Sequence, residues 1–194
     1  VTVYAEVTPN PAVMKFVANK KLVPGVFEFK NIDEAGDSPL ARKLFEFPYV
    51  REVFMDLNYI SVTKYEVADW NEVTMELREM IREYLADGKP VLKEGAQPKQ
   101  PEGVGSGSAG DPNLDPTSVE IINILEEYVK PAVASDGGNI VFQSYEAQSK
   151  TVHVVLQGAC SGCPSSTYTL KNGIQTMLQN MMGDKVSEVV AING

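Results

Sequence analysis

The chain has 194 residues, of which 43% are hydrophobic and 22% are charged, proportions that fit one large or two small globular domains. Its formal net charge of -9 argues against nucleic acid and anionic membrane surfaces as partners, because such partners are bound chiefly through lysine and arginine. The sequence has no run of about 18 apolar residues, so we expect no transmembrane helix.

The first part of the chain, residues 1–87, predicts a small α+β domain. Ser38 and Pro39 mark the start of a short helix, since serine caps helices and proline suits the first helical position. A longer helix with one apolar face follows Asp69, which resembles a capping box with Glu72. The expected strands, of which the last two form a hairpin, span 3–7, 14–17, 26–29, 53–55 and 59–63.

A segment rich in glycine, proline and serine follows at residues 88–113. It has little to bury, so we expect a flexible linker that is semi-extended where proline is dense. The predicted organisation is therefore a first domain at 1–87, a linker at 88–113 and a second domain at 114–194.

The second domain is expected to be α+β as well, with the order α-β-β-α(-β) and its helices on one face of the sheet. Asp115 and Pro116 open its first helix, which Pro131 ends or kinks. The run Asp-Gly-Gly-Asn at 136–139 favours a turn. The remaining expected elements are strands at 140–143 and 151–156, a helix at 164–182 and a last strand at 186–192.

The only two cysteines of the chain, Cys160 and Cys163, stand three positions apart after the second of these strands. Two thiolates at this spacing can bind one metal centre but cannot complete it, because tetrahedral zinc and cubane iron–sulfur clusters take four ligands. The single histidine, His153, lies elsewhere in the sequence. The motif is therefore half a metal site, which needs a second copy of the chain or a ligand from outside.

The residues around the cysteines suit ligand binding. Pro164 fits the first position of the following helix, which places Cys163 at or next to the cap. The N–H groups and the positive dipole end of that helix favour thiolate over thiol. Gly158 and Gly162 let the backbone bend closely around a ligand, and the polar residues 165–167 offer further hydrogen-bond donors.

The spacing alone leaves several interpretations open, namely metal binding, thiol–disulfide exchange and chance. In a thioredoxin-like oxidoreductase, we would expect the cysteine pair to lie in a β-α-β order of elements. The cysteine loop does open a helix here, but the elements before it lack that order. A four-cysteine zinc site that bridges two chains also remains possible. A dithiol oxidoreductase and a bridging zinc protein are therefore the alternatives.

A longer stretch of sequence resembles the C-terminal domain of the NifU family, the Nfu-type iron–sulfur scaffold and carrier proteins. The matching runs are Val-Lys-Pro-Ala-Val-Ala-Ser-Asp-Gly-Gly-Asn at 129–139, Leu-Gln-Gly-Ala-Cys-Ser-Gly-Cys-Pro-Ser-Ser-Thr at 156–167 and its continuation through 169–174. The first domain is similar to the Nfu N-terminal domain through residues 8–11, 14–16, 38–41 and 60–64. Asn139 departs from the aspartate that is frequent in the family, which affects a turn rather than the cysteines.

This resemblance implies a [4Fe-4S] cluster shared between two chains, with Cys160 and Cys163 of each chain as its ligands. It implies a carrier rather than an enzyme, a homodimer when the cluster is bound, apo iron–sulfur proteins as recipients and an upstream scaffold as donor. The first domain has no cluster of ligands and is expected to bind other proteins. Two thiols fit a reducing compartment, which we predict to be the bacterial cytoplasm, or alternatively an organellar matrix after removal of a presequence.

Overall fold

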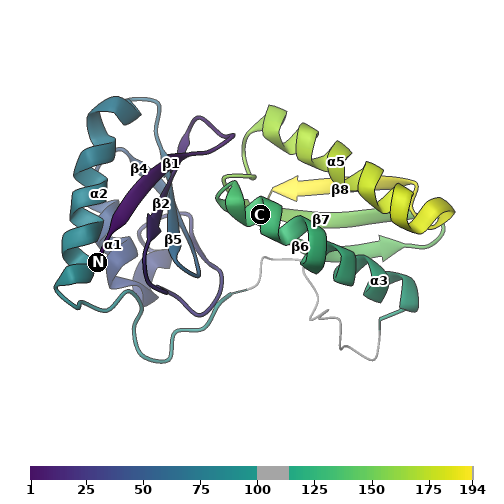
Figure 1. Cartoon of the computed structure of the whole chain (residues 1–194), viewed down its shortest axis with the longest axis horizontal. Coiled ribbons are helices and arrows are strands. Elements are labelled where there is room, and N and C mark those ends of the chain that lie inside the picture. The colour runs from purple at the N-terminus through teal and green to yellow at the C-terminus, as the bar shows by residue number, and fades with distance from the viewer. Residues whose placement is uncertain (100–113, 194) are drawn as a thin grey trace. The chain divides into compact units, whose positions relative to one another are not determined.

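The computed structural model describes residues 1–99 and 114–193, and the chain divides into two compact units at Val1–Lys99 and Gln100–Gly194 (Figure 1). Each unit combines helices with a sheet, which confirms the predicted α+β class. Among the described residues, none of the helices has both the length and the apolar character needed to cross a bilayer.

The first unit is built on a five-stranded antiparallel sheet in the order β1-β2-β5-β4-β3. Its long helix α2 (Trp70–Ala86) buries Val73, Leu77, Ile81 and Leu85, which are spaced to form one helical face. Asp69 caps this helix through the amide of Asn71. The other elements are β1 (Val3–Val7), β2 (Val13–Ala18), β3 (Phe27–Phe29), the short 3-10 helix η1 (Glu34–Asp37), α1 (Pro39–Phe45), β4 (Val50–Asp56) and β5 (Tyr59–Lys64).

The chain after α2 differs from the predicted linker, which was expected to begin at residue 88. Val91, Leu92 and Ala96 pack against the core of the first unit. The carbonyl of Val91 accepts a hydrogen bond of 2.7 Å from the Ser38 hydroxyl. The stretch contains only a few apolar side chains among many glycine and proline residues. Its overall composition therefore predicts a linker, although these side chains pack against the core. The rest of the expected linker, 100–113, lies outside the described residues.

The second unit is a three-stranded sheet with helices packed on it (Figure 1). Its central strand β7 (Thr151–Gly158) pairs antiparallel with β6 (Gly138–Glu146) and parallel with β8 (Glu188–Asn193). The helices are α3 (Pro116–Ile124), the π-helical segment η2 (Leu125–Val129), α4 (Lys130–Ser135), α5 (Pro164–Met182) and the 3-10 turn η3 (Gly183–Lys185). Alternate residues of β7 enter one core with α3 and α5, as expected for a sheet covered on one face.

Pro131 does not end its helix. The chain widens into one π-helical segment over Leu125–Val129 and then continues as α4. Proline has no N–H to donate to the carbonyl four residues back, and its ring clashes there, so a wider turn accommodates it. Leu125 and Val129 remain buried through this change, so the helical segments keep one apolar face toward the core.

Candidate metal centre

The cysteine loop, residues 159–163, joins the end of β7 to the start of α5 at one end of the sheet. Its backbone turns at two glycines, Gly158 with φ 65° and Gly162 with φ 77°. Residues with a side chain rarely adopt such positive φ angles, which explains why glycine occupies both positions. The amide of Ser161 donates to the carbonyl of Gly158 at 3.1 Å and closes the turn.

Helix α5 holds the other end of the loop. Cys163 is the N-cap residue, with Pro164 in the first turn, as the sequence predicts. The amide of Thr167 donates to the Cys163 carbonyl at 2.9 Å, and its hydroxyl donates to the Cys160 carbonyl at 3.2 Å. Thr167 therefore ties the carbonyls of both cysteines to the first turns of α5.

Cys160 is buried within the core of the second unit and is only 6% exposed. It packs against Gly138 at the start of β6. A Cβ atom at position 138 would lie 2.8 Å from the Cys160 sulfur and 2.6 Å from the carbonyl oxygen of Gln157. Both distances are too short for a real side chain, so the position of Cys160 depends on glycine at 138.

The segment 136–139 does more than form a turn. Only Asp136 and Gly137 belong to the turn, where Gly137 has φ 85°, and Gly138 already begins β6. The Gly137 carbonyl accepts a hydrogen bond of 3.2 Å from the amide of Ala159. Asn139 donates through its side-chain amide to the Gln157 side chain at 2.9 Å. The segment thus supports the cysteine loop through its backbone as well as through Gly138.

The two thiols lie in different environments, and neither is part of a disulfide. Burial, followed by the nearby carboxylate of Asp136, raises the pKa of Cys160 from 9.0 to about 12. At Cys160, burial therefore outweighs any stabilisation of the thiolate by the start of α5. Cys163 is half-buried at the helix start, with its sulfur 3.6 Å from the Ser165 hydroxyl.

This asymmetry predicts an order of reaction with an alkylating reagent. In the metal-free protein at pH 8, iodoacetamide is expected to modify Cys163 well before Cys160, because Cys160 is buried and protonated. Peptide mass mapping over time measures the order. The two cysteines should become equally reactive in urea, and equal reactivity in the folded chain would contradict the described burial.

The same pKa sets a pH dependence for the metal-free fold. As pH rises past 9.0, the unfolded chain loses the Cys160 proton while the folded chain keeps it until about pH 12. Below pH 9.0 the Cys160 thiol does not lower the free energy of unfolding. As pH increases from 9.0 toward 12, the free energy of unfolding decreases. Ligation also requires loss of the proton, so metal binding is favoured by rising pH.

The donor set within one chain is incomplete. Across residues 1–99 and 114–193, no three His, Cys, Asp or Glu side chains gather into a group that could hold a metal ion. The only histidine, His153, lies 3.5 Å from Glu146 on the paired strand and does not join the cysteines. The chemistry of the site is therefore that of two thiolates, soft ligands suited to zinc and iron–sulfur centres.

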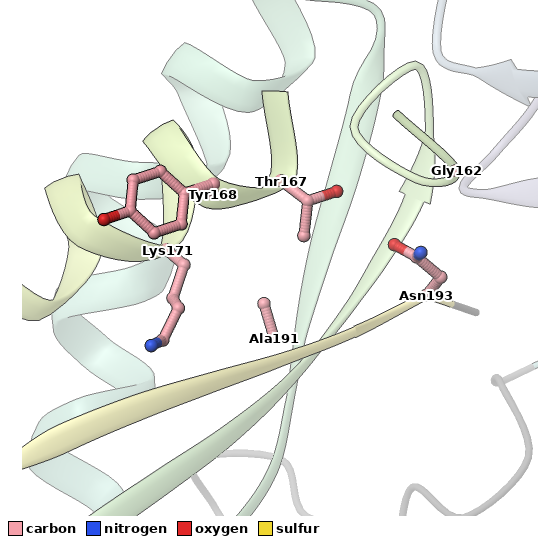
Figure 2. A pocket seen from close by; sticks show the side chains of 6 residues that line it. All are labelled: Gly162, Thr167, Tyr168, Lys171, Ala191 and Asn193. Atoms are coloured by element: carbon pink, nitrogen blue, oxygen red, sulfur yellow. The ribbon is translucent and has the colours of Figure 1, made fainter. Parts of the chain in front are cut away.

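The sequence identifies both cysteines and the cap position of Cys163, but it does not reveal two features of their surroundings. One is the contact of Gly138 with Cys160, for which the Gly-Gly pair ahead of a strand is the available signal. The other is a hollow beside the cysteine loop, between α5 and β8 (Figure 2). The hollow depends on packing between distant segments and has no sequence signal of its own.

The second unit is an α+β domain with two cysteines at the start of a helix. These features define the class as a dithiol protein whose cysteines are suited to metal binding. Comparison with known families is more specific. Residues 3–88 match the family model "Scaffold protein Nfu/NifU N terminal", and residues 121–190 match the "NifU-like domain". The chain belongs to the Nfu/NifU family, which confirms the resemblance drawn from its sequence.

Curated relatives match most of this chain. It is similar to the protein named "NFU1 iron-sulfur cluster scaffold homolog, mitochondrial" from Drosophila sechellia, with 38% identity over 89% of this chain and 58% of that protein. The human protein of the same name is 37% identical over 89% of this chain and 65% of its own length. The chain thus spans about three fifths of the length of these relatives. A solved structure of a NifU-like protein from Saccharomyces cerevisiae covers 48% of this chain at 24% identity, with a TM-score of 0.44.

Proposed function

We propose that this protein carries a [4Fe-4S] cluster between two copies of the chain and delivers it to apo iron–sulfur proteins. The observation that carries the proposal is the half-site itself, two cysteines in a loop that a helix start and a glycine contact hold in place. Two chains supply the four thiolates that a cubane cluster needs. The names of the relatives, which describe iron–sulfur cluster scaffolds, support cluster binding as the role.

The environments of the two cysteines suit a ligand set that can be dismantled. Cys160 is anchored in the core, whereas Cys163 is more exposed at the helix start. We propose that a recipient thiolate first replaces Cys163 at an iron atom. The recipient thiol loses its proton as the new Fe–S bond forms, and the released Cys163 thiolate takes up a proton as the old bond breaks. The oxidation state of the cluster does not change in this exchange, and separation of the two carrier chains completes release.

The alternative functions fit the site less well. The elements before the cysteine loop, from α3 to β7, run in the order α-α-β-β rather than the β-α-β order expected ahead of a thioredoxin-like cysteine pair. A zinc site bridging two chains uses the same four thiolates, but the relatives are named as iron–sulfur scaffolds. The carrier is also proposed to be non-enzymatic.

We further propose that the first unit binds partner proteins, either recipients or the scaffold that donates the cluster. If a chain starting near Leu114 delivered clusters to every recipient as fast as the full chain, this role would be wrong. For location, the mitochondrial relatives favour the organellar alternative, and we propose an organellar matrix rather than the bacterial cytoplasm.

Anaerobic reconstitution with iron and sulfide separates these functions. The carrier is expected to become brown, to contain iron and sulfide, and to run as a dimer that returns to a monomer when the cluster is removed. An oxidoreductase would instead stay colourless and monomeric and would reduce disulfides. A zinc protein would dimerise with zinc alone and exclude iron. Either of the last two results would contradict the proposal.

A further inference from the structure

A hollow of about 350 Å³ opens directly beside the cysteine loop. Its walls are the side chains of Thr167, Tyr168 and Lys171 from α5 and those of Ala191 and Asn193 from β8, while Gly162 of the loop forms its rim (Figure 2). The Tyr168 side chain is 67% exposed although it is a large aromatic group. Exposed tyrosines of this kind are frequent anchors of protein interfaces.

The strand that borders the hollow has an open edge. In the described sheet, β8 pairs with β7 on one side and with no strand on the other. The first part of its outer edge is covered, since the Gln175 side chain accepts a hydrogen bond of 3.1 Å from the Val189 amide. Amides of a strand alternate in direction, so those of Ala191 and Asn193 point outward on the same edge as that of Val189. Both residues line the hollow, and Asn193 lies nearer to Gly162 of the cysteine loop than Ala191 does (Figure 2).

From these observations we infer that the hollow and the adjoining edge of β8 bind an extended, cysteine-containing segment of the recipient protein. An added strand would bond to the outward backbone groups of Ala191 and Asn193, with a large side chain in the hollow against Tyr168. The same segment would then reach Gly162, which lies between the two cysteine ligands. This inference rests on the proposed transfer function, because a recipient thiolate has to reach the cluster before the carrier thiolates leave it.

The chemistry of recipients supports this occupant over a second copy of the chain. Cluster-binding cysteines commonly occur in closely spaced runs such as C-x2-C-x2-C, which present thiolates from a short stretch of backbone. A backbone edge accepts such stretches whatever their side chains, so one carrier can serve several recipients. The second copy, in contrast, is expected to contribute its own cysteine loop rather than a strand.

The test uses full-length protein loaded with a cluster and, as probe, an apo-ferredoxin with the bacterial C-x2-C-x2-C-x3-C-P ligand run. Tyr168→Ala removes the exposed ring, and Asn193→Pro removes an outward amide at the end of β8. The matched control for Tyr168→Ala is Tyr128→Ala, another exposed tyrosine of the same unit. Asn193→Ala removes the side chain but keeps the amide, so its comparison with Asn193→Pro isolates the effect of the backbone amide. Transfer is followed by the spectrum of the ferredoxin, and release to a small iron chelator is measured in parallel.

We expect Tyr168→Ala and Asn193→Pro to slow transfer to the ferredoxin by about tenfold, with cluster content, dimer content and release to the chelator unchanged. Tyr128→Ala should transfer at the rate of the unsubstituted chain, and Asn193→Pro should transfer more slowly than Asn193→Ala. Unchanged transfer in both test variants would overturn the inference, and loss of the dimer in them would assign the hollow to the second copy instead. A failure of the unsubstituted chain to load any cluster is a separate result, which would overturn the proposed function.

Discussion

Substitution of either cysteine by serine is expected to abolish stable cluster binding. A dimer of Cys160→Ser or Cys163→Ser chains retains two thiolates instead of the four that a cubane takes. After anaerobic reconstitution and desalting, iron and sulfide should fall to the background of an unrelated protein. Loss of dimerisation should accompany the loss of metal, because the cluster itself joins the chains in the proposed function.

A control for this experiment must show that the loop still folds. Serine is close to cysteine in size, so the circular dichroism spectrum and the unfolding midpoint should change little for half-buried Cys163, and somewhat more for buried Cys160. Ser165→Ala removes a neighbouring hydroxyl that is not a proposed ligand, and it should keep the cluster. If either serine variant held a full complement of iron and sulfide, the cysteine that it replaces would not be a required ligand.

The second large effect is expected at Gly138. In Gly138→Ala the new methyl group would lie 2.8 Å from the Cys160 sulfur and 2.6 Å from the Gln157 carbonyl oxygen. Backbone or Cys160 has to move, at a cost of about 1–3 kcal/mol in the free energy of unfolding. Because the displaced atom is a proposed ligand, the cluster content after reconstitution should fall along with stability. Thermal unfolding and iron analysis of the same preparation measure both effects.

The chain offers a matched control for this substitution. Gly173 lies inside α5, and a Cβ atom there would meet nothing within 4 Å. Gly173→Ala is therefore expected to stabilise the unit by about 0.5–1 kcal/mol, since alanine favours the helix more than glycine does. Its cluster content should remain that of the unsubstituted chain. Equal behaviour of the two alanine variants would contradict the described contact between Gly138 and Cys160.

Local signals in the sequence were sufficient for much of the fold. Ser38 and Asp115 mark true helix starts, because a capping side chain acts within a few residues of its own position. The apolar spacing of α2 likewise predicts which of its side chains are buried. The cysteine pair and its position at the start of α5 also follow from short-range patterns, so the candidate ligands could be named without a structure.

Features that depend on distant segments could not be predicted in this way. The high pKa of Cys160 arises from burial under β6 and from Asp136, whereas the sequence shows only the helix that follows it. Val91 and Leu92 pack against the core of the first unit, although the composition of the sequence predicts that this domain ends at residue 87. The hollow beside the loop forms where β8 returns to lie parallel to β7. In each case tertiary contacts override the local pattern.

The most direct test of the central claim is the mass of the reconstituted protein under native, anaerobic conditions, together with its iron and sulfide content. The proposed function predicts a dimer that carries one [4Fe-4S] cluster, with four iron atoms shared by two chains. Removal of the cluster should return the chain to its monomer mass of 21.2 kDa. A monomer that retains a complete cluster would contradict the account, because one chain would then supply every ligand that the bound iron requires.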